Sequence, residues 1–183
     1  DVSWQKPTSV GDGAAGITGY RVVATPVGGD ALPPKDAGTS LSTNLDGLTA
    51  GTAYNVTVAA RNAEGWSEAS APTGPVTAHT APEPPTVAAV TPLADALWVS
   101  WDAGADNGAT ITSYRATATD SAGGFAACTA TGTDRSCVIS DLSSTDEYTV
   151  VVTATNRAGT SADSDPSAAV QPLDPDSTEP TPA

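Results

Sequence analysis

Apolar and polar residues alternate with a period of two in several short stretches of the chain. The apolar positions of two such stretches are Tyr54, Val56, Val58 and Ala60, and Tyr148, Val150, Val152 and Ala154. Leu97, Val99 and Trp101 follow the same rule in a third stretch. Successive side chains of a β-strand point to opposite faces, so each stretch predicts a strand with one buried face. No stretch has a helical period, and the chain is therefore predicted to be all-β.

Clusters of Gly, Asp and Asn separate these stretches. They are Gly11-Asp12-Gly13, Gly28-Gly29-Asp30, Asp106-Asn107-Gly108 and Gly123-Gly124. These residue types favour tight turns, because they tolerate unusual backbone angles or bond to their own backbone. Many short strands with frequent turns are typical of a β-sandwich.

The order of the motifs repeats once along the chain. Val2-Ser3-Trp4 recurs as Val99-Ser100-Trp101, residues 17–21 recur as residues 111–115, and residues 52–67 recur as residues 146–161. The last two matches share one offset, and the first differs from it by three residues, so the length difference lies in the loop after the first tryptophan. Variation confined to a loop is typical of two related folded domains.

Composition agrees with two small domains. Only 5% of the 183 residues are aromatic, Phe occurs once and Met is absent, so one large core would lack bulky side chains. The repeat and the Pro-rich segment 79–85 predict domains at residues 1–80 and 81–172. The acidic, Pro- and Thr-rich residues 173–183 predict a linker or tail to another module.

The chain is strongly acidic, with a formal net charge of -14. Such a chain repels phosphate backbones and anionic headgroups, so nucleic acid is not an expected partner. No apolar run approaches the ~20 residues of a membrane span, so membrane insertion is not expected. Abundant Ala, Thr, Gly and Asp with little Lys favour a bacterial source.

Several of the repeated motifs resemble the fibronectin type III family. The matching positions are Trp4, Tyr20, Leu48, Tyr54, Asn62, Gly65 and Ser67 in the first copy, and Trp101, Tyr114, Leu142, Tyr148, Asn156, Gly159 and Ser161 in the second. The resemblance implies two seven-stranded Greek-key, immunoglobulin-like sandwiches in tandem, with tyrosine corners at Leu48–Tyr54 and Leu142–Tyr148. It also implies that these positions are structural and carry no activity.

The first copy opens inside the second strand of this pattern, at Val2-Ser3-Trp4. Domain 1 is therefore expected to lack its first strand, whereas residues 85–91 supply one to domain 2. Two explanations stay open at this point. The strand precedes the sequence in a longer polypeptide, or a neighbouring chain donates it to the open edge.

Cys128 and Cys137 are the only cysteines and flank a hairpin-like stretch with Gly132 and Asp134 near its turn. A pair this close can form a disulfide between adjacent strands, and compact secreted modules commonly use such bridges. A metal site is the alternative, but it needs further ligands, and the only histidine, His79, is far away in sequence. A disulfide predicts a secreted or cell-surface location.

The sequence offers no plausible set of catalytic residues. One histidine in a linker makes Ser-His-Asp and Cys-His sets implausible. Pairing Asp12 with Asp30, or Asp102 with Asp106, would put carboxylates in turns, where acidic residues are ordinary solvated groups. Gly11-Asp12-Gly13 and Asp106-Asn107-Gly108 offer oxygen ligands, but neither has the spacing of a complete calcium loop. The chain is predicted to be no enzyme and to need no cofactor or metal.

Two tryptophans are candidate contact residues. Trp98 has the opposite parity to Leu97 and Val99 and should point outward, and Trp66 follows the long strand that ends near Asn62. Arg61 lies on the outward parity of that strand, so a cation–π pair with Trp66 is one interpretation. The alternative is that Trp66 or Trp98 contacts a sugar ring or a partner protein.

Three functions remain open. The first is a non-catalytic spacer or interaction module of a modular extracellular protein, either beside a polysaccharide-degrading enzyme or in the stalk of a surface adhesin. The second is a binding module for carbohydrate or protein that uses the exposed tryptophans. The third is a self-assembling fibre subunit whose first domain receives a donated strand.

Overall fold

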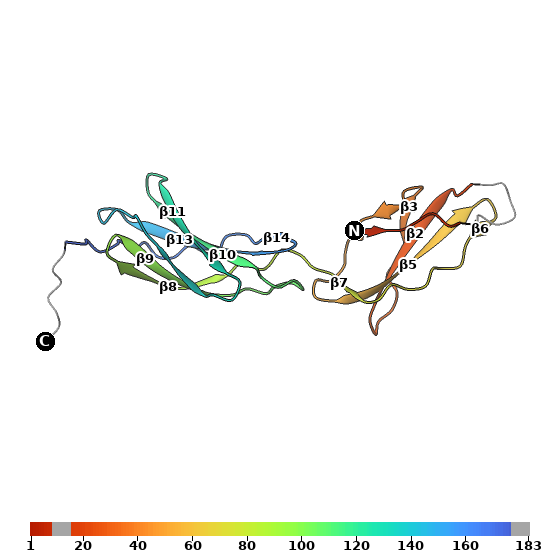
Figure 1. Cartoon of the computed structure of the whole chain (residues 1–183), viewed down its shortest axis with the longest axis horizontal. Helices are drawn as coiled ribbons and strands as arrows, with labels where there is room; N and C mark the ends of the chain where they lie inside the picture. Colours follow the sequence, from red (N-terminus) through yellow and green to blue (C-terminus); the bar gives the residue numbers. More distant parts are fainter. Residues whose placement is uncertain (9–15, 177–183) are drawn as a thin grey trace. The chain divides into compact units, whose positions relative to one another are not determined.

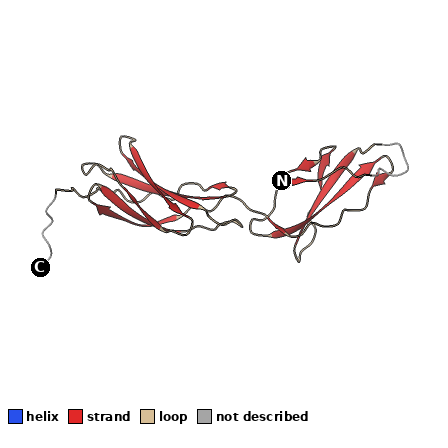
Figure 2. Cartoon of the chain, viewed as in Figure 1, coloured by secondary structure: helices blue, strands red, loops and turns tan. Residues whose placement is uncertain are grey.

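The computed structural model describes residues 1–8 and 16–176. The chain divides into two compact units, domain 1 (Asp1–His79) and domain 2 (Thr80–Ala183). Strands make up both units, and the described residues contain no helix (Figure 2). The prediction of an all-β chain with two sandwich domains in tandem is confirmed.

Domain 1 consists of two antiparallel sheets (Figure 1). The smaller sheet pairs β1 (Val2–Ser3) with β4 (Ser42–Thr43). The larger sheet contains β3 (Lys35–Gly38), β2 (Gly19–Pro26), β5 (Ala53–Asn62) and β6 (Gly65–Trp66) in that order, and β7 (Val76–Thr77) also pairs with β5. Among the described residues, β1 therefore has a hydrogen-bonded neighbour on one edge only.

Domain 2 repeats this plan, with one more strand in its smaller sheet and one fewer in its larger sheet. That sheet has the order β12 (Ser136–Ile139), β9 (Ala96–Asp102) and β8 (Thr86–Leu93). The other sheet has the order β11 (Phe125–Thr131), β10 (Ser113–Asp120), β13 (Tyr148–Asn156) and β14 (Gly159–Thr160). Because β9 is the counterpart of β1, β8 occupies a position that no described strand of domain 1 fills.

The two cores differ in completeness. In domain 2, the alternating residues of β9, β10 and β13 meet between the sheets, and Leu97, Val99, Val150 and Val152 are fully buried. Among the described residues of domain 1, the buried cluster consists of Val22, Ala24, Tyr54 and Val56, with further apolar residues partly exposed around it. The alternation that predicted the strands therefore produces a closed core in one copy and a partly open core in the other.

The predicted hairpin around Gly132 is wrong. β11 and β12 belong to different sheets, so the chain crosses from one layer of the sandwich to the other between them. At the crossing, the Gly132 amide donates to the Thr112 carbonyl at 3.0 Å, and a Cβ at Gly132 would collide with the Ile111 carbonyl. The turn signals of this segment identified a change of direction, but not which sheet receives the next strand.

The segment expected to connect the domains is bound to domain 2 from Thr80 onward. The Thr80 amide donates to the Asn107 carbonyl at 3.3 Å, and the Glu83 amide donates to the Ala105 carbonyl at 2.9 Å. At the other end of the domain, Leu173 pairs with Ala94 and exchanges backbone hydrogen bonds with Leu93 and Asp95. Leu173 was assigned to the tail by its sequence, but its backbone completes domain 2.

Candidate functional site

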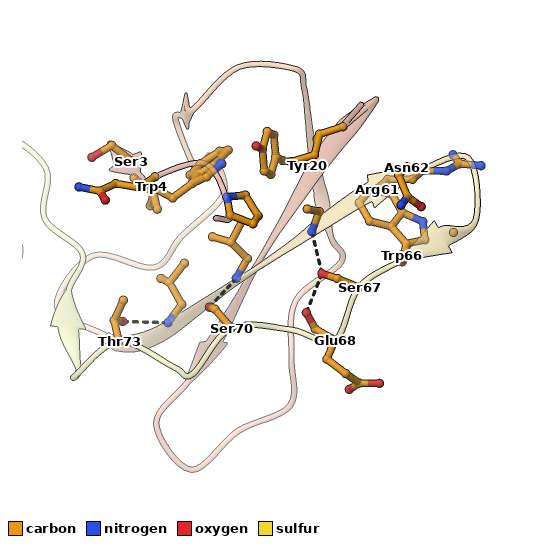
Figure 3. Close-up of a pocket in the computed structure, with 18 of the residues that line it drawn as sticks. Ser3, Trp4, Tyr20, Arg61, Asn62, Trp66, Ser67, Glu68, Ser70 and Thr73 are labelled. Carbon is orange, nitrogen blue, oxygen red and sulfur yellow. Dashed lines mark hydrogen bonds between the residues drawn. The ribbon is translucent and has the colours of Figure 1, made fainter. Parts of the chain in front are cut away.

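A groove of about 680 Å³ lies along the open side of domain 1 (Figure 3). β1 and the residues that follow it form one wall, the inward side chains of β5 form the floor, and the irregular segment 67–73 forms the opposite wall. Trp66 and Arg61 lie at one end of it. Its lining is mostly apolar, which is the usual character of a binding site in a protein surface.

A ladder of hydroxyl groups fixes the wall formed by residues 67–73. The side-chain oxygens of Ser67, Ser70 and Thr73 accept hydrogen bonds from the backbone amides of Ala60, Val58 and Val56 at 3.0–3.1 Å. The backbone amides of the same three residues donate back to the carbonyls of those β5 residues. This segment therefore satisfies the edge of β5 without being a regular strand.

The same ladder occurs in domain 2, where Ser161, Ser164 and Ser167 bond to Ala154, Val152 and Val150. This ladder was not predicted from the sequence. Its signal was a hydroxyl residue at every third position, in the same place of both repeats.

Two aromatic residues line the groove, Trp4 directly after β1 and Tyr20 on β2. The rings of Trp4 and Tyr20 lie 5.5 Å apart in a tilted arrangement, and those of Trp101 and Tyr114 repeat it at 5.3 Å in domain 2. The indole nitrogen of Trp4 is buried and has no hydrogen-bond partner within the described residues. Trp4 thus contributes mainly apolar surface to the groove.

Trp66 pairs with two guanidinium groups. The Cζ atoms of Arg61 and Arg21 lie 5.7 Å and 4.6 Å from its ring centroid. The contact between Arg61 and Trp66 was predicted from the sequence, but that of Arg21, the closer of the two, was not. Arg21 follows from strand pairing, because Arg21 lies opposite Ala59 on β5 and therefore diagonally beside Arg61 on the same face.

Trp98 lies on the outer face of the three-stranded sheet of domain 2. It is opposite Val138 on β12 and Thr91 on β8, and it exposes 36% of its surface. Val138 and Leu93 are also exposed. Trp66 and Trp98 lie in different domains, and the structure brings no polar ligand set to Trp98 among its cross-strand neighbours.

Cys128 and Cys137 form a disulfide that joins β11 to β12. Their Cα atoms are 6.1 Å apart, within the ordinary range for such a bridge. Because β11 and β12 are edge strands of opposite sheets, the bridge closes one side of the domain 2 sandwich. The metal alternative for these two cysteines is excluded by this bond.

The candidate carboxylates are placed only in part. Gly11-Asp12-Gly13 lies outside the described residues, so the pairing of Asp12 with Asp30 is not defined. The Asp106 side chain accepts a hydrogen bond from the Gly108 amide at 3.0 Å, which is a turn-forming contact. Within residues 1–8 and 16–176, no three acidic, His or Cys side chains gather as a metal-binding group.

Tyr54 and Tyr148 each hold the loop that precedes their strand. The Tyr54 hydroxyl accepts a hydrogen bond from the Thr49 amide at 3.0 Å, and the Tyr148 hydroxyl accepts one from the Ser143 amide at 3.1 Å. Leu142 is buried beside the second of these corners, and Leu48 packs partly buried in domain 1. This geometry is a tyrosine corner.

A buried asparagine was named by its sequence motif but not assigned a role. The side-chain nitrogen of Asn156 donates to the carbonyls of Thr80, Asp106 and Ala109, and its oxygen accepts from the Ala158 and Gly159 amides. Asn156 is thus the polar centre that holds the start of domain 2 against its loops.

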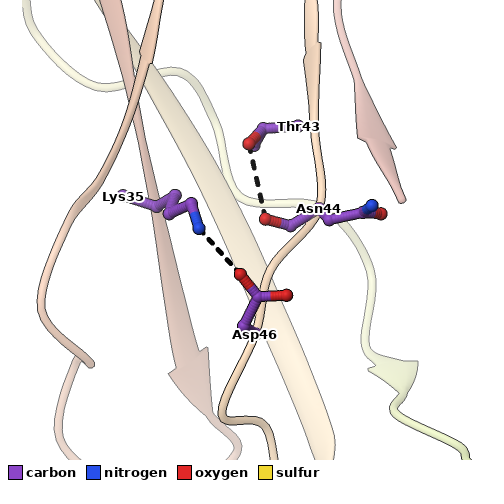
Figure 4. A network of polar contacts seen from close by, with 4 residues as sticks. All are labelled: Lys35, Thr43, Asn44 and Asp46. Atoms are coloured by element: carbon purple, nitrogen blue, oxygen red, sulfur yellow. Dashed lines mark hydrogen bonds and ion pairs between the residues drawn. The ribbon is translucent and has the colours of Figure 1, made fainter.

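Ionisable groups are few in the interior. Burial raises the pKa of Tyr114, and the guanidinium of Arg135, 5.0 Å from the centroid of the Tyr114 ring, acts in the opposite direction. On the surface of domain 1, Lys35 donates to Asp46 at 2.7 Å and lowers the pKa of that carboxyl through this hydrogen bond and its charge (Figure 4). Both partners are exposed, so the pair adds little to stability.

The comparisons with known proteins agree with this description. A family model described as "Fibronectin type III domain" matches residues 1–76 and again residues 80–170. A comparison with curated protein sequences gave no match. Within the part of the chain that the structure describes, no helix has the length and apolar character of a membrane span.

Two solved structures illustrate the similarity. The chicken CNTN1 FN1-FN3 domains are 21% identical, with a TM-score of 0.50, over 84% of this chain and 55% of that one. A segment of two fibronectin type-III domains from chicken tenascin is 20% identical, with a TM-score of 0.43, over 92% of this chain and 89% of that one. At such identities the similarity extends to the fold alone.

Proposed function

Because the chain belongs to the fibronectin type III family, with one domain in each half, we propose that it is a spacer and interaction module of a modular extracellular protein. The family is typically non-catalytic and commonly mediates protein interactions. Two settings fit this role: an accessory position beside a polysaccharide-degrading catalytic domain, or a place in the stalk of a surface adhesin.

The disulfide between the two sheets of domain 2 is the observation that carries the extracellular part of this proposal. Structural disulfides persist in oxidising compartments, whereas cytosolic thiols are kept reduced. The bridge also joins strands that hydrogen bonds do not connect, so it protects a small domain against opening at that side. Protection of this kind is useful in a module that must survive outside the cell.

The conspicuous polar residues support a structural role. The three hydroxyls of each ladder, the tyrosine corners and Asn156 all bond to the backbone of their own domain. Their geometry fixes loops and strand edges. The residues that the two copies share therefore explain how the sandwich holds together, and they need no substrate to account for them.

Carbohydrate binding is the second candidate function, and Trp98 favours it more than Trp66 does. The ring of Trp66 has two guanidinium neighbours within its own domain. These cation–π contacts explain why a tryptophan lies at this position without a ligand. Trp98 instead has Val138 and Thr91 beside it on an exposed sheet face. An exposed indole between Val138 and Thr91 offers a surface on which a sugar ring can stack.

Binding and hydrolysis assays with insoluble polysaccharides separate these functions. The oxidised 183-residue chain is incubated with cellulose, chitin and xylan, and both the bound fraction and the released sugar are measured. The spacer proposal expects neither. Sugar release by pure chain would refute the non-catalytic proposal, and binding that Trp98→Ala abolishes while Trp66→Ala retains would replace it with the carbohydrate-binding one.

A further inference from the structure

Phe125 is the only phenylalanine of the chain, and it exposes 69% of its surface, more than any other large apolar residue that the structure describes. It begins β11, the outermost strand of the four-stranded sheet of domain 2 (Figure 1). Among the described strands, β11 pairs with β10 alone. An exposed side chain of this size beside an open sheet edge is a feature of association sites.

β11 lacks the features that protect an edge strand. It has seven residues, none of them charged and none proline, and it pairs with β10 without a register shift. In domain 1, the strand in the same place is β3, which has four residues, begins with Lys35 and Asp36, and pairs with β2 through a register shift. Short length, charge and irregular pairing prevent association between sheet edges. Domain 2 therefore leaves open an edge of the kind that domain 1 protects.

The hydrogen bonds at both ends of β11 show which of its backbone groups are already used. The Gly132 amide donates to the Thr112 carbonyl at 3.0 Å. At the other end, the Asp120 amide donates to the Gly124 carbonyl at 3.0 Å. Bonded positions alternate along an antiparallel pair, so the even-numbered residues from 124 to 132 face β10 and the odd-numbered ones face the open edge.

The open edge therefore presents the backbone amides and carbonyls of Phe125, Ala127 and Thr129, whose side chains are exposed. The next residue on this edge, Thr131, donates its amide to the Asp134 carboxylate at 3.2 Å. This bond ends the open stretch, so an added strand has three residues with which to pair.

We propose that this edge pairs with the same edge of a second copy of the chain, antiparallel and around a two-fold axis at Ala127. In this register Ala127 lies opposite its own copy, and Phe125 lies opposite Thr129 of the second copy. Each open residue then exchanges its backbone hydrogen bonds with an open residue of the other copy. This is the register that leaves none of the open backbone groups unpaired.

The side chains agree with this register. Phe125 lies opposite the second copy's Thr129, and an aromatic residue opposite a β-branched one stabilises an antiparallel strand pair. Ala127 on the axis is small, so it leaves room beside each phenylalanine ring.

The lack of charge allows this acidic chain to pair with itself. Each copy has a formal net charge of -14, so two copies repel each other over most of their surfaces. No Asp, Glu, Lys or Arg occurs between residues 125 and 131, so the paired strands place no like charges opposite each other. The contact is small, and a weak dimer is therefore expected. The inference goes beyond the spacer role and does not depend on it.

Analytical ultracentrifugation of the oxidised 183-residue chain, at up to about millimolar concentration, tests the proposal. The mass should rise from 18.1 kDa toward twice that value, and added salt should strengthen the dimer because it screens the repulsion between the copies. Ala127→Asp places two carboxylates on the axis and should weaken the dimer at least about tenfold. The matched control is Thr149→Asp, which adds the same charge to an exposed position on β13, two strands from the edge. It should change the dissociation constant by less than about twofold.

Two further variants separate hydrogen bonding from packing. Ala127→Pro removes an amide that faces the open edge and should abolish the dimer, because no bond to β10 depends on that amide. Phe125→Ala should weaken the dimer about threefold or more, because both aromatic pairs are lost. Circular dichroism and thermal unfolding check that each variant is folded. If Ala127→Pro does not fold, Ala127→Asp and Phe125→Ala still test the edge, since both side chains are exposed.

A mass of 18.1 kDa at every concentration would overturn the proposal. A dimer that tolerates both Ala127→Asp and Phe125→Ala would overturn the assignment to β11. Amide exchange by NMR in the dilute monomer should be fast at Phe125, Ala127 and Thr129. Slow exchange at all three would mean that another segment of the polypeptide covers the edge, and it would overturn the choice of a second copy.

Discussion

Removal of the disulfide in domain 2 should lower the stability of that domain by an amount that follows from the size of the loop it closes. Cys128 and Cys137 are nine residues apart in sequence and close a loop between the two sheets. The chain-entropy relation for a loop of this size gives about 2.6 kcal/mol at 25 °C. For a domain of this length, that loss should lower the midpoint of thermal unfolding by about 10 °C or more.

The assay compares the oxidised chain with the reduced chain and with the Cys128→Ala/Cys137→Ala double variant. Calorimetry measures the transitions, and hydrogen exchange of peptides from β5 and β13 assigns each transition to its domain. Only the domain 2 transition should move, because domain 1 has no cysteine. The double variant should lose slightly more, since both cysteines also pack against the core.

Two results would refute this reasoning. A domain 2 shift below about 2 °C would mean that the unfolded chain is hardly constrained by the bridge. An equal shift in domain 1 would mean that the two units do not unfold separately, contrary to their division into two compact units.

The remaining predictions concern single side chains of domain 2. Tyr148→Phe should cost about 1 kcal/mol in urea unfolding, because the Ser143 amide loses its acceptor, whereas Tyr114→Phe should cost almost nothing, because the buried Tyr114 hydroxyl has no partner in the described structure. Equal losses would contradict the assigned hydrogen bonds. Burial raises the pKa of Tyr114, so its contribution to stability is fully present below the ordinary tyrosine pKa of about 10 and is lost as the pH rises above it. Tyr114→Phe should therefore flatten the fall in stability measured between about pH 9 and 11, and an unchanged fall would count against this cause. Ser164→Ala should cost about 1–3 kcal/mol, because it leaves the buried Val152 amide unsatisfied. Ser70→Ala, at the exposed equivalent position in domain 1, should cost clearly less, because water can replace the hydroxyl there. A larger loss of stability in Ser70→Ala than in Ser164→Ala would contradict this role of burial.

Much of the sandwich could be predicted because its buried positions repeat with a strand period. The alternation of apolar and polar residues is enough to predict that Leu97, Val99 and Trp101 point inward. Tyr54 and Tyr148, each with its preceding leucine, recur at the offset of the repeat. These patterns involve residues that are close together in the chain, so they can be recognised without the structure. The contact between Trp66 and Arg61 could be predicted for the same reason.

Other features depend on which sheet a strand joins, and the sequence carries little information on that choice. Gly132 and Asp134 indicate a turn, but a hairpin and a crossing between sheets use similar turn residues. The hydroxyl ladder lies in an irregular segment whose period of three belongs to neither a strand nor a helix. The groove of domain 1 is lined by β1, β5 and the segment 67–73 together, so it depends on how the two sheets pack and has no local sequence signal.

Quantitation of free thiols in the protein from its native source, blocked at the moment of lysis, tests the extracellular proposal most directly. We expect no free thiol and a mass two hydrogens lower than that of the reduced chain, because Cys128 and Cys137 form a disulfide between the two sheets of domain 2. Two free thiols in the native protein would contradict the claim that domain 2 resides in an oxidising compartment.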